Sequence, residues 1–155
     1  MRVTARGDYA VRAAVELAAA GGATRKVADL ASAQNIPARF LENILLALRR
    51  AGLVQSRRGA DGGFRLTRAP ELITVADVLR AVEGPLANVQ GVSPDQLDYE
   101  GPAAALRDVW VAVRASLRVV LERVTLAEVA SGSLPEDVAL LIADPEAWRV
   151  HSPQV

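Results

Sequence analysis

The segment best equipped for chemistry runs from Val54 to Arg68, VQSRRGADGGFRLTR, and holds four arginines and three glycines. Such a segment would suit a phosphate-binding enzyme loop, a solvent-exposed hairpin or a surface that lies against a polyanion. A phosphate loop is disfavoured because the glycines follow the pattern G-x-x-G-G, without the dinucleotide-binding spacing or a Walker lysine. The residues after the glycines have strand character, whereas a nucleotide loop leads into a helix N-terminus. The spacing therefore argues against the enzyme loop and leaves the other two interpretations.

The chain has 155 residues and a net charge of zero, yet its charge is divided unevenly along the sequence. The first 68 residues contain 12 basic and 5 acidic residues, a balance of +7. The remaining residues contain 6 basic and 13 acidic residues, a balance of −7. This asymmetry indicates a basic half that meets a polyanionic partner and an acidic half with a different role.

The residue types that metal sites and covalent catalysis require are scarce. The chain has no cysteine and a single histidine, His151, so thiolates cannot hold zinc or an iron–sulfur cluster. No carboxylate spacing indicates another metal site, and no nucleophile is patterned with a base. We therefore expect no cofactor, no metal and no enzymatic activity. The absence of a secretory signal and of an apolar run of about 18 residues predicts a cytoplasmic protein that does not enter a membrane.

Helical periodicity in the first half predicts a helix-turn-helix. Residues 4–20 form a first helix with Thr4 as its N-cap, and residues 27–33 form a short second helix. The third helix, residues 38–51, follows Pro37 and ends at Gly52. It is expected to bury five apolar residues, namely Phe40, Leu41, Ile44, Leu45 and Leu48. Its other face is polar and basic, which is the pattern of a recognition helix.

Two short strands, residues 53–56 and 64–67, follow the third helix and are joined by the glycine turn. Their alternation places Phe64 and Leu66 on one face and Arg65 on the other. A hairpin directly after a helix-turn-helix is a wing. The predicted fold class is therefore mostly α with a small β-hairpin: a winged helix-turn-helix with a long C-terminal dimerisation helix.

The second half is predicted to contain that dimerisation helix. Thr74 caps a helix over residues 75–82, and the following loop, residues 83–101, has no helical period. Residues 102–124 form the longest helix, whose apolar seam repeats at about 3.5 residues and comprises Leu106, Val109, Trp110, Val113, Leu117, Val120, Leu121 and Val124. The seam could pack on its own domain, but its length favours pairing with a second copy. A short helix over residues 125–130 follows, and we expect the tail beyond Gly132 to be loosely ordered at its end.

Four segments together resemble the Rrf2 family of bacterial transcription regulators: MRVTARGDYAVRA, IPARFLENILLALRRAGLVQSRRGADGGFRLTR, ITVADVLRAVEGPLA and VTLAEVA. The wing pattern R-G-x-x-G-G-[FY] and the segment AVEGPLA are specific to this family. The resemblance implies a winged helix-turn-helix domain (1–83), a sensor-region loop (84–101), a dimerisation helix with a short helix after it (102–131) and a C-terminal tail (132–155). It also implies a homodimeric repressor that binds a palindromic operator in double-stranded DNA.

Many members of the family bind an iron–sulfur cluster through three cysteines near the start of the long helix. Some of them supply an acidic fourth ligand at the position of Asp8. This chain has no cysteine, so the resemblance implies a member without the cluster. Asp8 is then expected to be an acid in the first turn of a helix, where the helix dipole favours it.

The resemblance and the helix phase together predict the DNA contacts. Residues at the start of the third helix are expected to meet base edges, namely Ala38, Arg39, Glu42 and Asn43. Contacts to the DNA backbone are expected from Arg2, Thr4, Tyr9, Arg49 and Arg50. In the wing, Arg58 is expected to enter the minor groove and Arg57 and Arg65 to meet phosphates. The wing glycines are expected to let the backbone approach the groove closely: Gly59, Gly62 and Gly63.

The acidic half is expected to sense a signal as well as to dimerise. A small effector in a pocket beside Tyr99 and Trp110 competes with a plain role for Trp110 as an anchor of the dimer. A regulatory protein partner is a further alternative, because one cluster-free relative is bound by a metabolic enzyme. The competing function for the whole chain is a winged-helix module for protein interaction or small-ligand sensing that has lost DNA binding. Arg39, Arg57, Arg58 and the basic first half argue against it.

Overall fold

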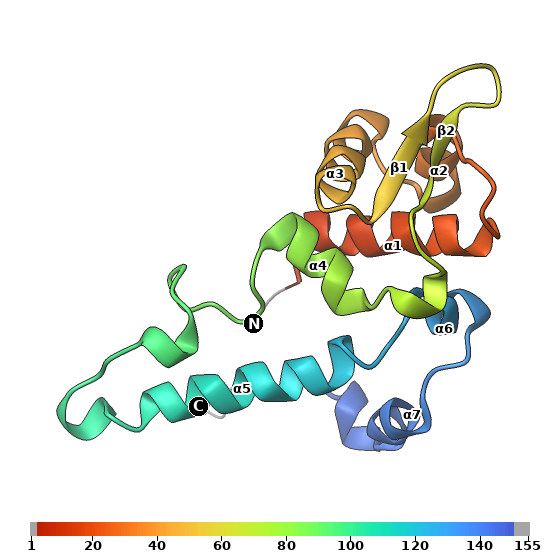
Figure 1. Ribbon diagram of the computed structural model, residues 1–155. Coiled ribbons are helices and arrows are strands. Elements are labelled where there is room, and N and C mark those ends of the chain that lie inside the picture. The colour runs from red at the N-terminus through yellow and green to blue at the C-terminus, as the bar shows by residue number, and fades with distance from the viewer. Residues whose placement is uncertain (1–2, 151–155) are drawn as a thin grey trace.

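The computed structural model describes residues 3–150 and is mostly helical, with one small antiparallel hairpin (Figure 1). In chain order its elements are α1 (Ala5–Ala19), α2 (Val27–Gln34), α3 (Ala38–Arg50), β1 (Val54–Arg57), β2 (Gly63–Leu66), η1 (Pro70–Leu72), α4 (Val75–Glu83), η2 (Pro94–Gln96), η3 (Gly101–Ala103), α5 (Leu106–Leu121), α6 (Leu126–Ser131), α7 (Glu136–Ala143) and η4 (Pro145–Trp148). This order confirms the predicted fold class. Within the described residues, no helix is both long and apolar enough to cross a membrane.

Threonine side chains fix the start of three helices. Thr4 Oγ1 accepts a hydrogen bond of 3.1 Å from a backbone N–H in the first turn of α1, which confirms it as the N-cap. Thr74 and Thr125 start α4 and α6 through capping boxes, in which the side chains of Asp77 and Glu128 accept from the threonine N–H groups. These bonds satisfy donors that the first helical turn leaves free. The starts of these helices were therefore predictable from local sequence.

Helix α1 runs through the winged-helix part, with α3 and the hairpin on one side and α4 and α6 on the other (Figure 1). Its buried residues are mostly small: Gly7, Ala10, Ala13, Ala14, Leu17 and Ala18. Helix α3 buries four larger residues at helical spacing, namely Leu41, Ile44, Leu45 and Leu48. The small side chains of α1 let the helices approach closely, so this crossing forms the centre of the core.

The prediction that Phe40 faces inward is wrong. Its side chain is 41% exposed, because Phe40 lies at the edge of the buried stripe of α3. It packs edge-on against Tyr9 of α1, with the ring centroids 5.8 Å apart. Phe40 therefore joins α3 to α1 at the surface and not in the core.

A single residue before α2 pairs with the free edge of the hairpin. β1 and β2 pair antiparallel, with Val54 opposite Leu66. On the other edge of β2, Phe64 exchanges backbone hydrogen bonds of 2.8 and 2.9 Å with Arg25, which precedes α2. Phe64 and Leu66 pack on the core and Arg65 is exposed, as the alternation predicted. The wing is thus anchored to the residue before α2 through one edge of β2, and to the core through Phe64 and Leu66.

Helix α5 is the longest helix, and none of its 16 residues is buried within the protomer. Its bounds correct the predicted helix of residues 102–124. It begins later because Gly101–Ala103 form a separate 3₁₀ turn, and it ends before Val124. Val124 is only 6% exposed, and its carbonyl accepts a hydrogen bond of 2.9 Å from the Val75 N–H. The prediction that Val124 lies on the α5 seam is therefore wrong, because Val124 packs in the protomer next to α4.

The loop before α5 folds back onto that helix through η2. Arg114 of α5 donates to Ser93 Oγ at 2.6 Å and forms an ion pair of 2.8 Å with Asp95. The hydrogen bond from Ser93, followed by that from Arg114, lowers the pKa of Asp95 to about 2. The indole N–H of Trp110 is buried and has no acceptor among the described residues.

The segment after α6 is more regular than predicted. Residues 136–148 form α7 and η4, two elements that were not predicted within the C-terminal tail. Val138 is buried, and the Trp148 indole N–H donates to the Ile142 carbonyl at 2.7 Å. The end of the predicted tail, residues 151–155 with His151, lies outside the described residues.

Candidate nucleic-acid interface

The start of α3 presents four neighbouring exposed residues, all of which were predicted to meet base edges: Ala38, Arg39, Glu42 and Asn43. The preceding turn positions them. Asn35 ends α2 in the left-handed conformation, with φ of 51°, and Pro37 leads into α3. Asn43 Nδ2 donates to the Arg39 carbonyl at 3.3 Å, which is a local contact within the helix. Arginine, glutamate and asparagine side chains at such positions have the donors and acceptors that base edges require.

Residues of α1 pack against the start of α3 and the end of α2. The Arg12 guanidinium lies 5.4 Å from the centroid of the Tyr9 ring, and Tyr9 in turn packs against Phe40. Arg12 Nε also donates to Gln34 Oε1 at 3.1 Å, at the end of α2. Tyr9 is half-buried in this contact. The structure therefore gives Tyr9 a positioning role for α3 in addition to the backbone contact predicted for it.

The other residues predicted near the N-terminus are placed differently. Arg2 lies outside the described residues. The hydroxyl of Thr4 caps α1 and also donates to Glu83 Oε1 at 2.5 Å. Thr4 is exposed, but its side chain is occupied at the junction of α1 and α4. A DNA contact by Thr4 would have to compete with these two hydrogen bonds.

The wing carries Arg57 at the end of β1 and Arg58 in the turn, and both side chains are exposed. The turn is held by two hydrogen bonds of 2.9 Å, one from Thr24 Oγ1 to the Asp61 carbonyl and one from the Gly62 N–H to the Gly59 carbonyl. The turn projects beyond the helices that surround it (Figure 1). Arg58 therefore lies at the part of the molecule that reaches furthest from the core on this side.

Two of the three wing glycines are needed by the protein's own backbone. A Cβ at Gly62 would lie 2.6 Å from the Arg57 carbonyl oxygen, and one at Gly63 would lie 2.5 Å from the Arg25 carbonyl oxygen. Gly59 has φ of 109° and open space around it. Close packing of the hairpin backbone therefore explains why residues 62 and 63 are glycine, even without DNA. Gly59 is explained by the positive φ that the turn requires at this position.

Basic side chains between residues 25 and 68 form no ion pair with any described residue: Arg25, Lys26, Arg39, Arg49, Arg50, Arg57, Arg58, Arg65 and Arg68. All except Arg25 are exposed. Arg49 donates to Ser56 Oγ at 3.3 Å, which ties the end of α3 to β1. Cations that no carboxylate neutralises are available to a polyanion.

Sequence reasoning missed two members of this surface, Arg25 and Lys26. They precede α2 in the chain, and the backbone pairing of Arg25 with Phe64 brings them beside the wing. Lys26 is exposed at the first residue before α2. The adjacent basic pair was visible in the sequence, but its position beside the hairpin depends on a contact between distant residues.

The second half shows the opposite arrangement of charge. Within the described residues, every arginine from residue 80 onward forms an ion pair: Arg80, Arg107, Arg114, Arg118, Arg123 and Arg149. Hydrogen bonds from Arg80 and then from Arg118 lower the pKa of Glu122. Hydrogen bonds from the backbone and side chain of Thr125 lower the pKa of Glu128. Basic groups in this half are already satisfied within the protein.

The residues present do not fit an iron–sulfur cluster. The chain has no cysteine, and within residues 3–150 no group of three or more His, Asp or Glu side chains could hold a metal ion. The carboxylate of Asp8 pairs with Arg12 at 3.1 Å in the first turn of α1. Asp8 therefore has the helix-surface role that the sequence predicted for it.

Comparisons with known sequences agree with this geometry. Residues 3–132 match the model of the Rrf2 family, described as iron-dependent transcriptional regulators. Rv1287 of Mycobacterium tuberculosis, an HTH-type transcriptional regulator by name, is 53% identical over 148 residues, which cover 95% of this chain and 92% of the relative. The HTH-type transcriptional regulator CymR of Bacillus subtilis is 35% identical over 132 residues, which cover 84% of this chain and 91% of the relative.

Solved structures show the same fold. CymR, the global cysteine regulator of B. subtilis, superposes with a TM-score of 0.72 at 34% identity and covers 85% of this chain and 98% of its own. IscR of T. potens superposes with a TM-score of 0.66 at 30% identity and covers 98% of this chain and 94% of its own. The residues that match the family model, 3–132, extend from the winged helix through α5 and α6. The chain therefore belongs to the Rrf2 family of transcriptional regulators.

Proposed function

We propose that this regulator is a homodimeric repressor that binds a palindromic DNA operator without an iron–sulfur cluster. The observation that carries the proposal is a surface of exposed basic side chains on α3, the wing and the start of α2, none of which forms an ion pair with a described residue. A protein surface that leaves its cations without carboxylate partners has a favourable interaction with DNA phosphates, which grows as salt is lowered.

In this proposal α3 enters the major groove. Arg39 donates two hydrogen bonds to a guanine, Glu42 accepts from a cytosine amino group and Asn43 pairs with an adenine. All three side chains are exposed at the N-terminal end of the helix, which is the end that meets base edges in helix-turn-helix proteins. Arg49 and Arg50 lie further along α3 and contact phosphates.

The wing lies against the neighbouring minor groove. Arg58 inserts into the groove, where narrow A·T-rich sequences concentrate negative potential. Arg57 and Arg65 contact phosphates on either side, joined by Lys26 at the start of α2. The support for this arrangement is that each of these side chains is exposed and none is ion-paired with a described residue.

Two copies pair through the apolar seam of α5. Its residues are Leu106, Val109, Trp110, Val113, Leu117, Val120 and Leu121. The support is that α5 buries no residue within the protomer, although an apolar stripe of this length is normally covered. A two-fold dimer presents two recognition helices to two half-sites, so its operator is palindromic.

The direct test is binding of the purified protein to DNA from its own promoter region, followed by selection from random sequences. We expect a bound sequence with two-fold symmetry. A protein that selects no sequence would instead be a winged-helix module for protein interaction or ligand sensing.

The role of the wing is tested by replacing Arg58 with alanine. The expected result is an operator affinity about tenfold lower and a salt dependence reduced by about one released counterion, measured by fluorescence anisotropy over a salt series. Arg107→Ala is the matched control because Arg107 is exposed on α5 and paired with Asp108. Equal affinities and equal salt slopes for the two variants would contradict a role of the wing in binding.

A further inference from the structure

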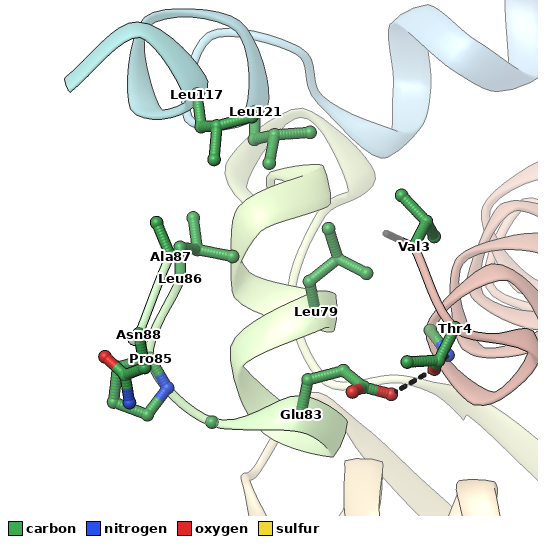
Figure 2. Close-up of a pocket in the computed structure, with 12 residues that line it drawn as sticks. Val3, Thr4, Leu79, Glu83, Pro85, Leu86, Ala87, Asn88, Leu117 and Leu121 are labelled. Carbon is green, nitrogen blue, oxygen red and sulfur yellow. Dashed lines mark hydrogen bonds between the residues drawn. The ribbon is translucent and has the colours of Figure 1, made fainter. Parts of the chain in front are cut away.

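A cavity of about 510 Å³ lies where the start of α1, α4 and α5 meet. Figure 2 shows Leu79 and Glu83 of α4 at its centre, Leu117 and Leu121 of α5 on one side, and Val3 and Thr4 on another. The chain after α4, residues 84–88, closes the remaining side. Small-molecule sites in proteins typically measure about 300–1,000 Å³, so this cavity has the size of a ligand site.

Among the described residues that line it, the cavity has apolar walls and a single charged group. Four leucines line it, namely Leu79, Leu86, Leu117 and Leu121, and no arginine or lysine among the described residues does so. Glu83 supplies the charge, and the Thr4 hydroxyl holds its carboxylate at 2.5 Å (Figure 2). Glu83 forms no ion pair with a described residue. A ligand that complements this arrangement has an apolar body and one positive charge.

One residue that lines the cavity has an unusual backbone conformation. Ala87 adopts φ of 58°, in the left-handed region that non-glycine residues rarely occupy. Figure 2 shows Leu86 and Ala87 side by side on the wall opposite Val3. Non-glycine residues in this region cost about 1 kcal/mol or more and cluster at ligand sites. The unusual conformation falls in a segment that closes the cavity.

We propose that this cavity binds a small organic cation, an apolar molecule with one protonated amine. The apolar body lies among the four leucines, and the ammonium group donates hydrogen bonds to the Glu83 carboxylate. The ligand differs from the effector expected beside Tyr99 and Trp110, because neither residue lines this cavity.

The position of the cavity predicts what the ligand does, and this second step rests on the proposed function. One wall belongs to α1 and α4 of the winged-helix part. The other belongs to Leu117 and Leu121 of α5, which are also part of the proposed dimer seam, so the cavity borders the proposed dimer interface. A ligand that contacts both walls holds α5 at one angle to the winged helix. In a dimer joined by α5, that angle determines the separation of the two recognition helices, so the ligand changes operator affinity.

Binding is tested on the full-length protein with three probes that share one body: 4-phenylbutylamine, 4-phenylbutanol and 4-phenylbutyrate. We expect the amine to bind at least about tenfold more tightly than the alcohol, and the carboxylate to bind most weakly, because a charge-assisted hydrogen bond to Glu83 discriminates among them. Calorimetry gives the affinities. Backbone NMR shifts at residues 84–88 show whether the probe occupies this cavity.

Two variants and a control complete the test. Glu83→Gln keeps the acceptor for Thr4 and removes the charge, so the preference for the amine should fall to about twofold or less. Leu86→Trp fills part of the cavity and should abolish binding of all three probes. Glu71→Gln removes an exposed carboxylate outside the cavity and should change nothing. Equal affinities for the three probes, an unchanged preference in Glu83→Gln, or no shift at residues 84–88 would overturn the site.

The effect on DNA is measured separately by anisotropy with the selected operator, with and without 4-phenylbutylamine. We expect operator affinity to change by about fivefold or more in the wild type and to be insensitive in Leu86→Trp. Amine binding without a change in operator affinity would keep the site and reject the coupling. Failure of the protein to bind DNA at all would reject the proposed function and leave the calorimetric result standing.

Discussion

The winged-helix part and α5 differ in two properties: whether their basic side chains are paired with acids, and whether their apolar faces are buried. The winged helix buries its apolar faces around α1 and α3, and its exposed cations from Lys26 to Arg68 have no carboxylate partner within residues 3–150. Helix α5 pairs each of its arginines with an acid and buries none of its residues. One region therefore offers free positive charge, and the other offers uncovered apolar surface. The difference indicates two kinds of partner, a polyanion for the first region and a second apolar helix for the second.

The largest expected effect comes from placing a charge on the open face of α5. Val109 is 50% exposed in the protomer and lies on the seam, so Val109→Asp should leave the protomer folded. In a dimer the aspartate would be buried without a partner, and we expect the dimer dissociation constant to rise by about a hundredfold or more. Operator affinity should fall in parallel because one half-site binds alone. Analytical ultracentrifugation and anisotropy measure the two effects.

The control for this prediction is on the same helix. Val119 is 65% exposed but lies off the seam, so Val119→Asp adds the same charge without entering the proposed interface. It should remain a dimer. If both variants dissociate, or neither does, the assignment of the seam fails.

The next largest effect is a difference in operator affinity between removing an unpaired arginine and removing a paired one. Arg39→Ala should lower operator affinity by about ten- to a hundredfold and relax specificity at one base pair, since a bidentate base contact contributes about 1–3 kcal/mol. Arg118→Ala removes a cation that is already paired with Glu122 and should leave operator affinity unchanged. Binding to operators with single base changes measures both quantities. Equal losses in the two variants would mean that free charge does not distinguish the two regions.

A smaller effect tests why the wing contains glycine. Gly63→Ala places a Cβ 2.5 Å from the Arg25 carbonyl oxygen, so we expect the free energy of unfolding to fall by about 1–3 kcal/mol. Gly59→Ala meets no atom within 4 Å and should lower it less. Urea unfolding compares the two. Full stability of Gly63→Ala together with lost operator binding would instead support the predicted approach of this glycine to DNA.

The smallest effect concerns the ion pair that holds η2 on α5. The pKa of Asp95 is lowered to about 2 from an ordinary value of 3.8, so its contact is fully present above pH 3.8 and is lost as the pH falls toward 2. Arg114→Ala should raise the pKa of Asp95 toward its ordinary value, with little change in stability because the group is exposed. Carboxyl NMR titration measures this change. Arg107→Ala should leave the titration of Asp95 unaltered, and an unaltered titration in Arg114→Ala would contradict the role of that pair.

Most of the winged helix could be predicted because its signals are local. Threonine caps, the apolar spacing of α3 and the alternation of Phe64 with Arg65 act over a few residues. The errors arose where a position depends on distant neighbours. Helical periodicity extended α5 to Val124, but the chain leaves the helix and Val124 packs beside α4. As an apolar residue Phe40 was assigned to the buried stripe of α3, yet its side chain packs against Tyr9 at the surface.

The candidate interface was predictable in part for the same reason. Arg39 and Arg58 were found from helix phase and from the wing pattern, and both are exposed. Lys26 was missed because only the pairing of Arg25 with Phe64 brings it to the wing. The explanation of Gly63 also changed, since the backbone that it approaches belongs to the protein itself.

By itself the amino-acid sequence determined which groups exist and how they follow one another: a basic first half, an acidic second half, no cysteine, and helices with caps. These properties depend on composition and on interactions a few residues apart. Only the tertiary structure decided which charges are neutralised, which apolar face stays open and where a cavity forms. Arg80 and Glu122, for example, are 42 residues apart and meet only because α5 returns to α4. Whether a charge is neutralised, an apolar face is covered or a cavity is enclosed depends on which residues lie next to one another in space. Those neighbours are set when segments distant in the sequence pack together.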